Sequence, residues 1–92
     1  MTIRKILEAS TANITPDTMQ RIEDGALRVT TMSGPYGAFV YVLDDSELES
    51  QLISEPDLLL VLRHGRAKGC DWVYFDADAD LIEGLEDFTN LW

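Results

Sequence analysis

The sequence is poor in residues that bind metals or act as nucleophiles. Its 92 residues include one cysteine, Cys70, and one histidine, His64. A single cysteine forms no internal disulfide and cannot supply a zinc site built from several cysteines, which indicates a reducing setting. We interpret Cys70 as a small buried residue where a strand begins rather than as a nucleophile served by His64. We therefore expect no enzyme activity, no bound metal and no cofactor.

Long apolar runs are also missing. No run approaches the roughly 18 residues that a membrane span needs, and the first residues lack the apolar region of a signal peptide. Apolar residues make up 46% of the chain and charged residues 26%, which is typical of a globular protein. We therefore predict a single globular domain over residues 1–92, in the cytoplasm and away from membranes.

Basic residues are scarce and unevenly placed. Seven lysines and arginines face 17 acids, so the net charge is −10. None lies in residues 29–62, and none follows Lys68. Seven acids follow Gly69, namely Asp71, Asp76, Asp78, Asp80, Glu83, Glu86 and Asp87. Because such a charge repels phosphates, we expect no direct binding of nucleic acid.

Two segments carry the signals of a helix. In the first, Thr15 can cap the helix and Gly25 can end it. In the second, Ser54 can cap the helix and Gly69 can close it. Gly65 inside the second helix costs about 1 kcal/mol relative to alanine, which predicts close packing of that helix against a sheet.

Alternating or β-branched stretches predict a sheet. We expect four strands, over residues 3–10, 27–31, 38–43 and 70–75. Residues 33–37 have the composition of a turn, whereas residues 44–53 fit either a loop or a short helical turn. The resulting β-α-β-β-α-β order predicts an α+β fold. We expect a four-stranded, mainly antiparallel sheet with two helices on one face, as in the ferredoxin-like split βαβ arrangement.

The run Asp76-x-Asp78-x-Asp80 begins like the calcium loop of an EF-hand. The sixth position of such a loop needs glycine and holds Leu81, and the twelfth needs glutamate and holds Asp87. We therefore predict that residues 76–81 continue the last strand, with acids on one face and small apolar residues on the other.

The acids near the C-terminus are the candidate site for a partner. They are Asp76, Asp78, Asp80, Glu83, Glu86 and Asp87. Side chains two apart on a strand are about 6.8 Å apart, about twice the 3.4 Å rise between phosphates in a DNA strand. Such a row could occupy the basic groove of a protein that binds nucleic acid, whereas the simpler reading is a coat that keeps the chain soluble. Trp72, Tyr74 or Trp92 could anchor the contact if exposed, although Trp72 is equally suited to the core.

Three stretches resemble a small family of acidic proteins carried on plasmids, prophages and integrative elements of Proteobacteria. They are STANITP (residues 10–16), YGAFV (36–40) and GCDWVYFDAD (69–78), and Gly84, Leu85 and Trp92 extend the resemblance. The resemblance covers most of the chain and brings no established activity with it. Small acidic proteins on mobile elements often resemble anti-CRISPR and anti-restriction inhibitors, several of which mimic DNA. The resemblance therefore implies a role of this kind. This chain departs from simple mimics because its acids are concentrated rather than spread along helices.

Charge and resemblance together predict a small acidic, non-enzymatic inhibitor from a phage or mobile element. We expect it to bind a defence protein of a bacterial host, either a CRISPR effector or a restriction nuclease, through that protein's basic groove and as a DNA mimic. The alternative is a homodimeric regulatory or antitoxin-type module that uses an exposed strand edge. A third hypothesis is an enzyme subunit or metal-dependent protein that uses the Asp-x-Asp-x-Asp run.

Overall fold

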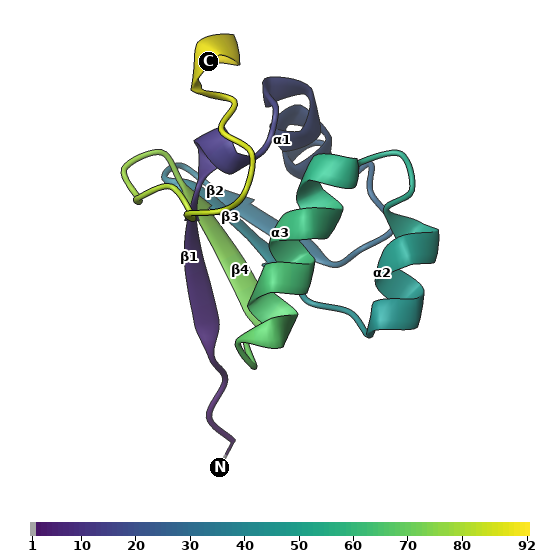
Figure 1. Ribbon diagram of the computed structural model, residues 1–92. Helices are drawn as coiled ribbons and strands as arrows, with labels where there is room; N and C mark the ends of the chain where they lie inside the picture. The colour runs from purple at the N-terminus through teal and green to yellow at the C-terminus, as the bar shows by residue number, and fades with distance from the viewer. Residues whose placement is uncertain (1) are drawn as a thin grey trace.

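The computed structural model describes residues 2–92, and Met1, part of the predicted domain, lies outside the described residues. Along the chain the elements are β1 (Ile6–Ser10), η1 (Thr11–Asn13), α1 (Pro16–Glu23), β2 (Thr31–Gly34), β3 (Gly37–Tyr41), α2 (Asp45–Gln51), α3 (Pro56–Ala67), β4 (Trp72–Asp76) and η2 (Thr89–Leu91), where η marks a 3-10 helix (Figure 1). The predicted α+β class and element order are confirmed. Residues 44–53, which fit either a loop or a short helical turn by sequence, contain helix α2.

The four strands form one mixed sheet in the order β1-β4-β3-β2. The pairs β2/β3 and β3/β4 are antiparallel, whereas β1 runs parallel to β4. The sheet is therefore mainly antiparallel, but its order differs from the ferredoxin-like one, in which the first strand is interior and every neighbour is antiparallel. The side chains explain this strand order. Strand β4 is mostly apolar on both faces and lies in the interior of the sheet, whereas β1 carries Glu8 and lies at the edge.

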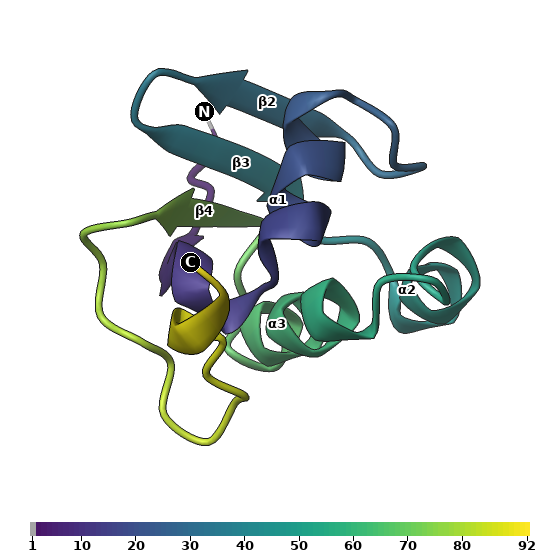
Figure 2. The same cartoon turned by 90° about the horizontal axis from the view of Figure 1, so that it is seen from above.

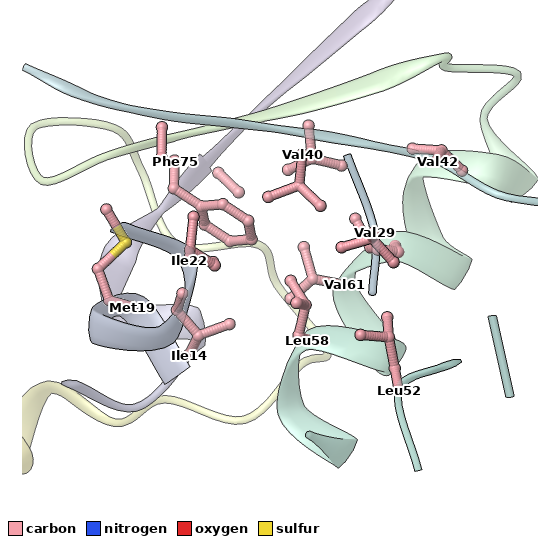
Figure 3. Packing of buried hydrophobic residues seen from close by; sticks show 14 of the residues in the cluster. Ile14, Met19, Ile22, Val29, Val40, Val42, Leu52, Leu58, Val61 and Phe75 are labelled. Atoms are coloured by element: carbon pink, nitrogen blue, oxygen red, sulfur yellow. The ribbon is translucent and has the colours of Figure 1, made fainter. Parts of the chain in front are cut away.

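Helices α1 and α3 cover one face of the sheet, and α2 packs beside α3 (Figures 1 and 2). The strands bury alternate residues toward these helices, such as Val40 of β3 and Phe75 of β4. Figure 3 shows these two side chains pointing toward Ile22 of α1 and Val61 of α3. The core thus lies between a sheet and a layer of helices, and the two predicted covering helices are confirmed.

The first helix begins and ends as predicted. The hydroxyl oxygen of Thr15 accepts a hydrogen bond from the backbone N–H of Thr18, at 3.2 Å, and Gly25 follows the helix with a φ of +66°. In α3 the predicted cap is wrong, because Glu55 occupies the capping position without a side-chain bond. Gly65 packs against the sheet as predicted, since a Cβ there would lie 3.1 Å from the Val73 side chain.

The first strand of the hairpin lies further along the chain than predicted. Residues 27–29 form bends, β2 begins at Thr31, and only residues 35–36 form the turn. Gly34 and Gly37 pair across the hairpin, so glycines that indicated a turn belong to strands instead. At Gly37 the reason is close approach, because a Cβ there would overlap the carbonyl oxygen of Phe75. No helix in the described part of the chain has the length and apolar character to cross a membrane.

Candidate functional site

The predicted site residues lie at the end of β4 and in the segment that follows it. We call residues 76–87 the acidic segment; its carboxylates belong to Asp76, Asp78, Asp80, Glu83, Glu86 and Asp87. Asp76 is half-buried and the other five residues are exposed. The segment leaves the end of β4 and passes beside η1 and the start of α1 (Figures 1 and 2). The fold therefore gathers these acids at one end of the molecule.

The acids do not form the straight row that the sequence predicted. β4 ends at Asp76, whose carboxylate accepts a hydrogen bond from the backbone N–H of Asp78, at 2.9 Å. The N–H of Ala79 bonds to the Asp76 carbonyl, at 3.2 Å. Because an aspartate side chain can satisfy the backbone two residues on, it turns the chain where alternation alone predicts a strand. The predicted continuation of the strand over residues 76–81 is therefore correct only at Asp76 and wrong for residues 77–81, so the acids do not keep the regular spacing of about 6.8 Å along a strand.

A buried asparagine holds the acidic segment in place. Asn13, at the end of η1, is 2% exposed. Its side-chain N–H donates to the carbonyl of Glu86, at 3.2 Å, and its side-chain oxygen accepts from the N–H of Ile82, at 2.9 Å. A third bond runs from the N–H of Phe88 to the carbonyl of Ala12, at 2.7 Å. The acidic segment and Phe88, the residue that follows it, are thus attached to the N-terminal part of the chain by three hydrogen bonds.

Sequence reasoning missed Asn13, although it lies within the STANITP stretch. The available signal was a polar residue between the apolar Ala12 and Ile14, two residues before the helix cap Thr15. The spacing of Leu85, Phe88, Leu91 and Trp92 on one face predicts a tail that docks through apolar side chains. Leu85 does pack against the core, but Leu91 and Trp92 are exposed, and the Trp92 indole N–H donates to the Ile14 carbonyl, at 3.0 Å. Hydrogen bonds therefore fix the tail as much as apolar contact does.

Among the described residues, no basic side chain forms an ion pair with the acidic segment. Within residues 2–92 no ion pair includes any of its six carboxylates. The ion pairs join Arg4 to Asp71, Arg21 to Glu55, Arg63 to Glu49 and Arg66 to Asp44. Asp71, the seventh acid after Gly69, is therefore set apart from the other six. Arginines compensate acids on the helices and at the start of β4, while the charge of the acidic segment remains open to solvent.

Hydrogen bonds shift the pKa of one carboxylate in the acidic segment, that of Asp87. The hydroxyl and the backbone N–H of Thr89 both donate to the side-chain oxygen of Asp87. These two bonds stabilise the ionised form and lower the pKa of Asp87 below its ordinary value, the hydroxyl having the larger effect. Asp87 therefore keeps its negative charge to lower pH than an unconstrained aspartate.

The face of the sheet away from the helices is a second feature, and the sequence indicated it only in part. Four aromatic side chains lie on it, from Phe39 and Tyr41 of β3 and from Trp72 and Tyr74 of β4, all half-buried. Trp72, for which both core and surface positions were considered, thus lies on an uncovered sheet face. We call this surface the open face.

A cleft beside the helices offers less chemistry. A cleft of about 400 Å³ lies between α1, α3 and the tail, beside Leu60, Leu85 and Phe88. One of its carboxylates, that of Asp57, already accepts bonds from Thr15 N–H, at 2.9 Å, and from the Thr18 hydroxyl, at 3.1 Å. Among the described residues no group of three or more histidines, cysteines or acids is arranged to hold a metal ion.

Comparison with known proteins gives one match. Residues 6–90 match the family described as "Family of unknown function (DUF5983) C-terminal domain". The match extends from β1 into η2, so it includes both the sheet and the acidic segment. No curated protein and no solved structure matches the chain. A family without an assigned activity was expected from the resemblance, whereas plasmids and phages are no part of the family description.

Proposed function

We propose that this chain, which belongs to the DUF5983 family, is a non-enzymatic domain that binds another protein through its acidic segment. The partner in this proposal is a bacterial protein that handles nucleic acid, and the bound surface is its basic groove. We propose further that the partner is a defence protein, either a CRISPR effector or a restriction nuclease. The domain would inhibit it in the cytoplasm on behalf of a phage or mobile element.

The absence of ion pairs in the acidic segment, over the described residues, carries this proposal. Acids that were paired with the chain's own arginines would not be available to a partner. Here the pairs lie elsewhere, and six carboxylates within 12 residues keep their charge. Opposite charges on a partner would increase the rate of association. Added salt would reduce this effect, because it shortens the Debye length, to about 8 Å at physiological ionic strength, and so screens the attraction.

The fixed conformation of the acidic segment also supports the proposed function. Holding a charged surface in one conformation before binding reduces the entropy lost on association. The three bonds to Asn13 and Ala12 provide such order. Because the acids follow a turn rather than a straight strand, the proposed competition with DNA rests on a curved patch of charge. It does not rest on the spacing of phosphates.

The test is DNA cleavage by purified restriction nucleases and CRISPR effectors over a series of salt concentrations. The test variant is Asp78→Asn with Asp80→Asn. The matched control is Glu23→Gln with Glu47→Gln, two exposed acids on α1 and α2 that change the net charge equally. We expect inhibition by the wild-type domain that falls with salt. Two exposed charges worth about 0.2–1 kcal/mol each predict a loss of affinity of about 2- to 30-fold in the test variant alone.

Two outcomes contradict the proposal. One is a domain that inhibits none of these enzymes at low salt. The other is equal loss of inhibition in the test and control variants, which would assign the effect to net charge rather than to the acidic segment.

A homodimeric module of regulatory or antitoxin type is the second candidate. The specific observation is that β1 and β2 are edge strands, so one side of each pairs with no other strand of the described chain. Exposed edges can pair with a second copy. Light scattering after gel filtration in high salt decides this, because a dimer joined by backbone pairing persists when charge is screened.

A further inference from the structure

The open face carries a continuous group of aromatic rings. Phe39 and Tyr74 are direct cross-strand neighbours with ring centroids 4.5 Å apart, and Tyr41 and Trp72 are neighbours at 5.1 Å. Phe39 and Trp72 join the two pairs, edge to face, at 6.4 Å. The rings support one another in fixed positions, and none of the helices in the described chain covers them (Figure 2).

Exposed apolar side chains surround these rings. Ile6 of β1 is 51% exposed and Met32 of β2 is 53% exposed, and Tyr36 in the hairpin turn is 82% exposed. Shallow grooves run on both sides of the Phe39–Tyr74 pair, one beside Ile6 and the other beside Met32 and Tyr36. A contiguous apolar surface of this kind on a soluble domain marks an interaction site.

We propose that the open face is the apolar centre of the interface with the basic partner, and that the acidic segment is part of its rim. The identity of the partner rests on the proposed function. Two observations join the surfaces. Asp76 alternates with Trp72 and Tyr74 along β4, so it lies on the open face, and it is also the first carboxylate of the acidic segment. The other charged strand residue on that face is Glu8, again an acid.

The negative charge of this surface favours a basic protein as its partner over two other possible partners. A second copy of the chain, face to face, would bring the Glu8 and Asp76 carboxylates of both copies into one interface, and each copy has a net charge of −10. Single-stranded nucleic acid stacks on aromatic sheet faces, but it needs a positive groove for its backbone. A protein with an apolar centre and a lysine- or arginine-rich rim complements both the rings and the acids.

The experiment uses the intact chain and, as a probe, a short peptide that alternates lysine with leucine. Binding is followed by two-dimensional NMR and by tryptophan fluorescence. We expect shift changes at Phe39, at Tyr74 and at the Trp72 indole. Met32→Lys removes apolar surface from the open face, whereas the control Leu60→Lys makes the same change at a 48% exposed position on α3. The expected loss of affinity is about tenfold for the first variant and less than about twofold for the control.

A second variant, Tyr36→Ser in the turn, tests the same face without altering a strand. Shift changes confined to the acidic segment, or equal affinity of Met32→Lys and Leu60→Lys, overturn the proposal. A dimer that Met32→Lys dissociates, or tight binding of an oligothymidine, assigns the face to another occupant and also overturns it. The nuclease assay separates the two proposals. If Asp78→Asn with Asp80→Asn reduces inhibition while Met32→Lys does not, the proposed function stands and this inference fails.

Discussion

Replacing Asn13 by alanine should release the acidic segment from the rest of the fold. The Asn13 side chain makes two hydrogen bonds to the backbone of the segment, one to the carbonyl of Glu86 and one from the N–H of Ile82. Alanine cannot make either bond, and nothing else among the described contacts replaces them. The change therefore tests whether one buried side chain positions the charged surface.

The size of the effect follows from these bonds. A neutral hydrogen bond contributes about 1 kcal/mol net, so the loss of two predicts about 2 kcal/mol less free energy of unfolding. The loss stays near this figure because the freed backbone groups reach water when the segment lifts away. In a domain of this size, 2 kcal/mol corresponds to a fall in melting temperature of roughly 8–16 °C.

Urea unfolding and amide hydrogen exchange measure the two consequences. The Ile82 amide loses its acceptor directly, so its exchange should accelerate in Asn13→Ala. The Phe88 amide, bonded to the Ala12 carbonyl, reports whether the whole segment lifts. Asn90→Ala, an exposed change in η2, is the control and should alter neither quantity. Wild-type exchange at Ile82 together with an unchanged urea midpoint would refute the reasoning.

Two further predictions concern the acidic segment and the hairpin. Because bonds from Thr89 lower the pKa of Asp87, they stabilise the tail above the ordinary aspartate value of 3.8 and are lost as the pH falls below it. Thr89→Val should raise the Asp87 midpoint in an NMR titration, and an unchanged midpoint would contradict this cause. Gly37→Ala should cost about 2–3 kcal/mol in urea unfolding, because its Cβ overlaps a carbonyl oxygen of β4, whereas Gly34→Ala has nothing within 4 Å and should cost less than about 0.5 kcal/mol.

Local signals in the sequence predicted α1 and α3 of the described chain, and they gave the limits of α1 correctly, whereas the predicted cap of α3 was wrong. Thr15 and Gly25 bound α1 as expected, because capping depends on the conformation of one or two residues. Gly65 correctly indicated a helix packed closely on the sheet. The excess of acids after Gly69 was equally evident from composition. Such features depend on near neighbours in the chain, so a single sequence is enough to recognise them.

Position in the sheet was not predictable in this way. Alternation shows that β1 and β4 are strands, but pairing depends on which surfaces meet after the chain collapses, so the parallel β1–β4 pair came only from the structure. The same limit applies to the open face. Alternation groups Phe39 with Tyr41 and Trp72 with Tyr74, but it shows neither that the two pairs share a face nor which face the helices cover.

For the candidate site, too, the sequence predicted some features and the tertiary structure decided the others. Residue identity alone placed the acids in one stretch of chain and determined their charge. Only the tertiary structure showed that the chain turns at Asp76, that Asn13 holds the segment from 69 residues away, and that the arginines pair elsewhere. Charge is a property of each side chain, whereas hydrogen bonds and ion pairs between distant residues exist only once folding has brought them within about 3–4 Å.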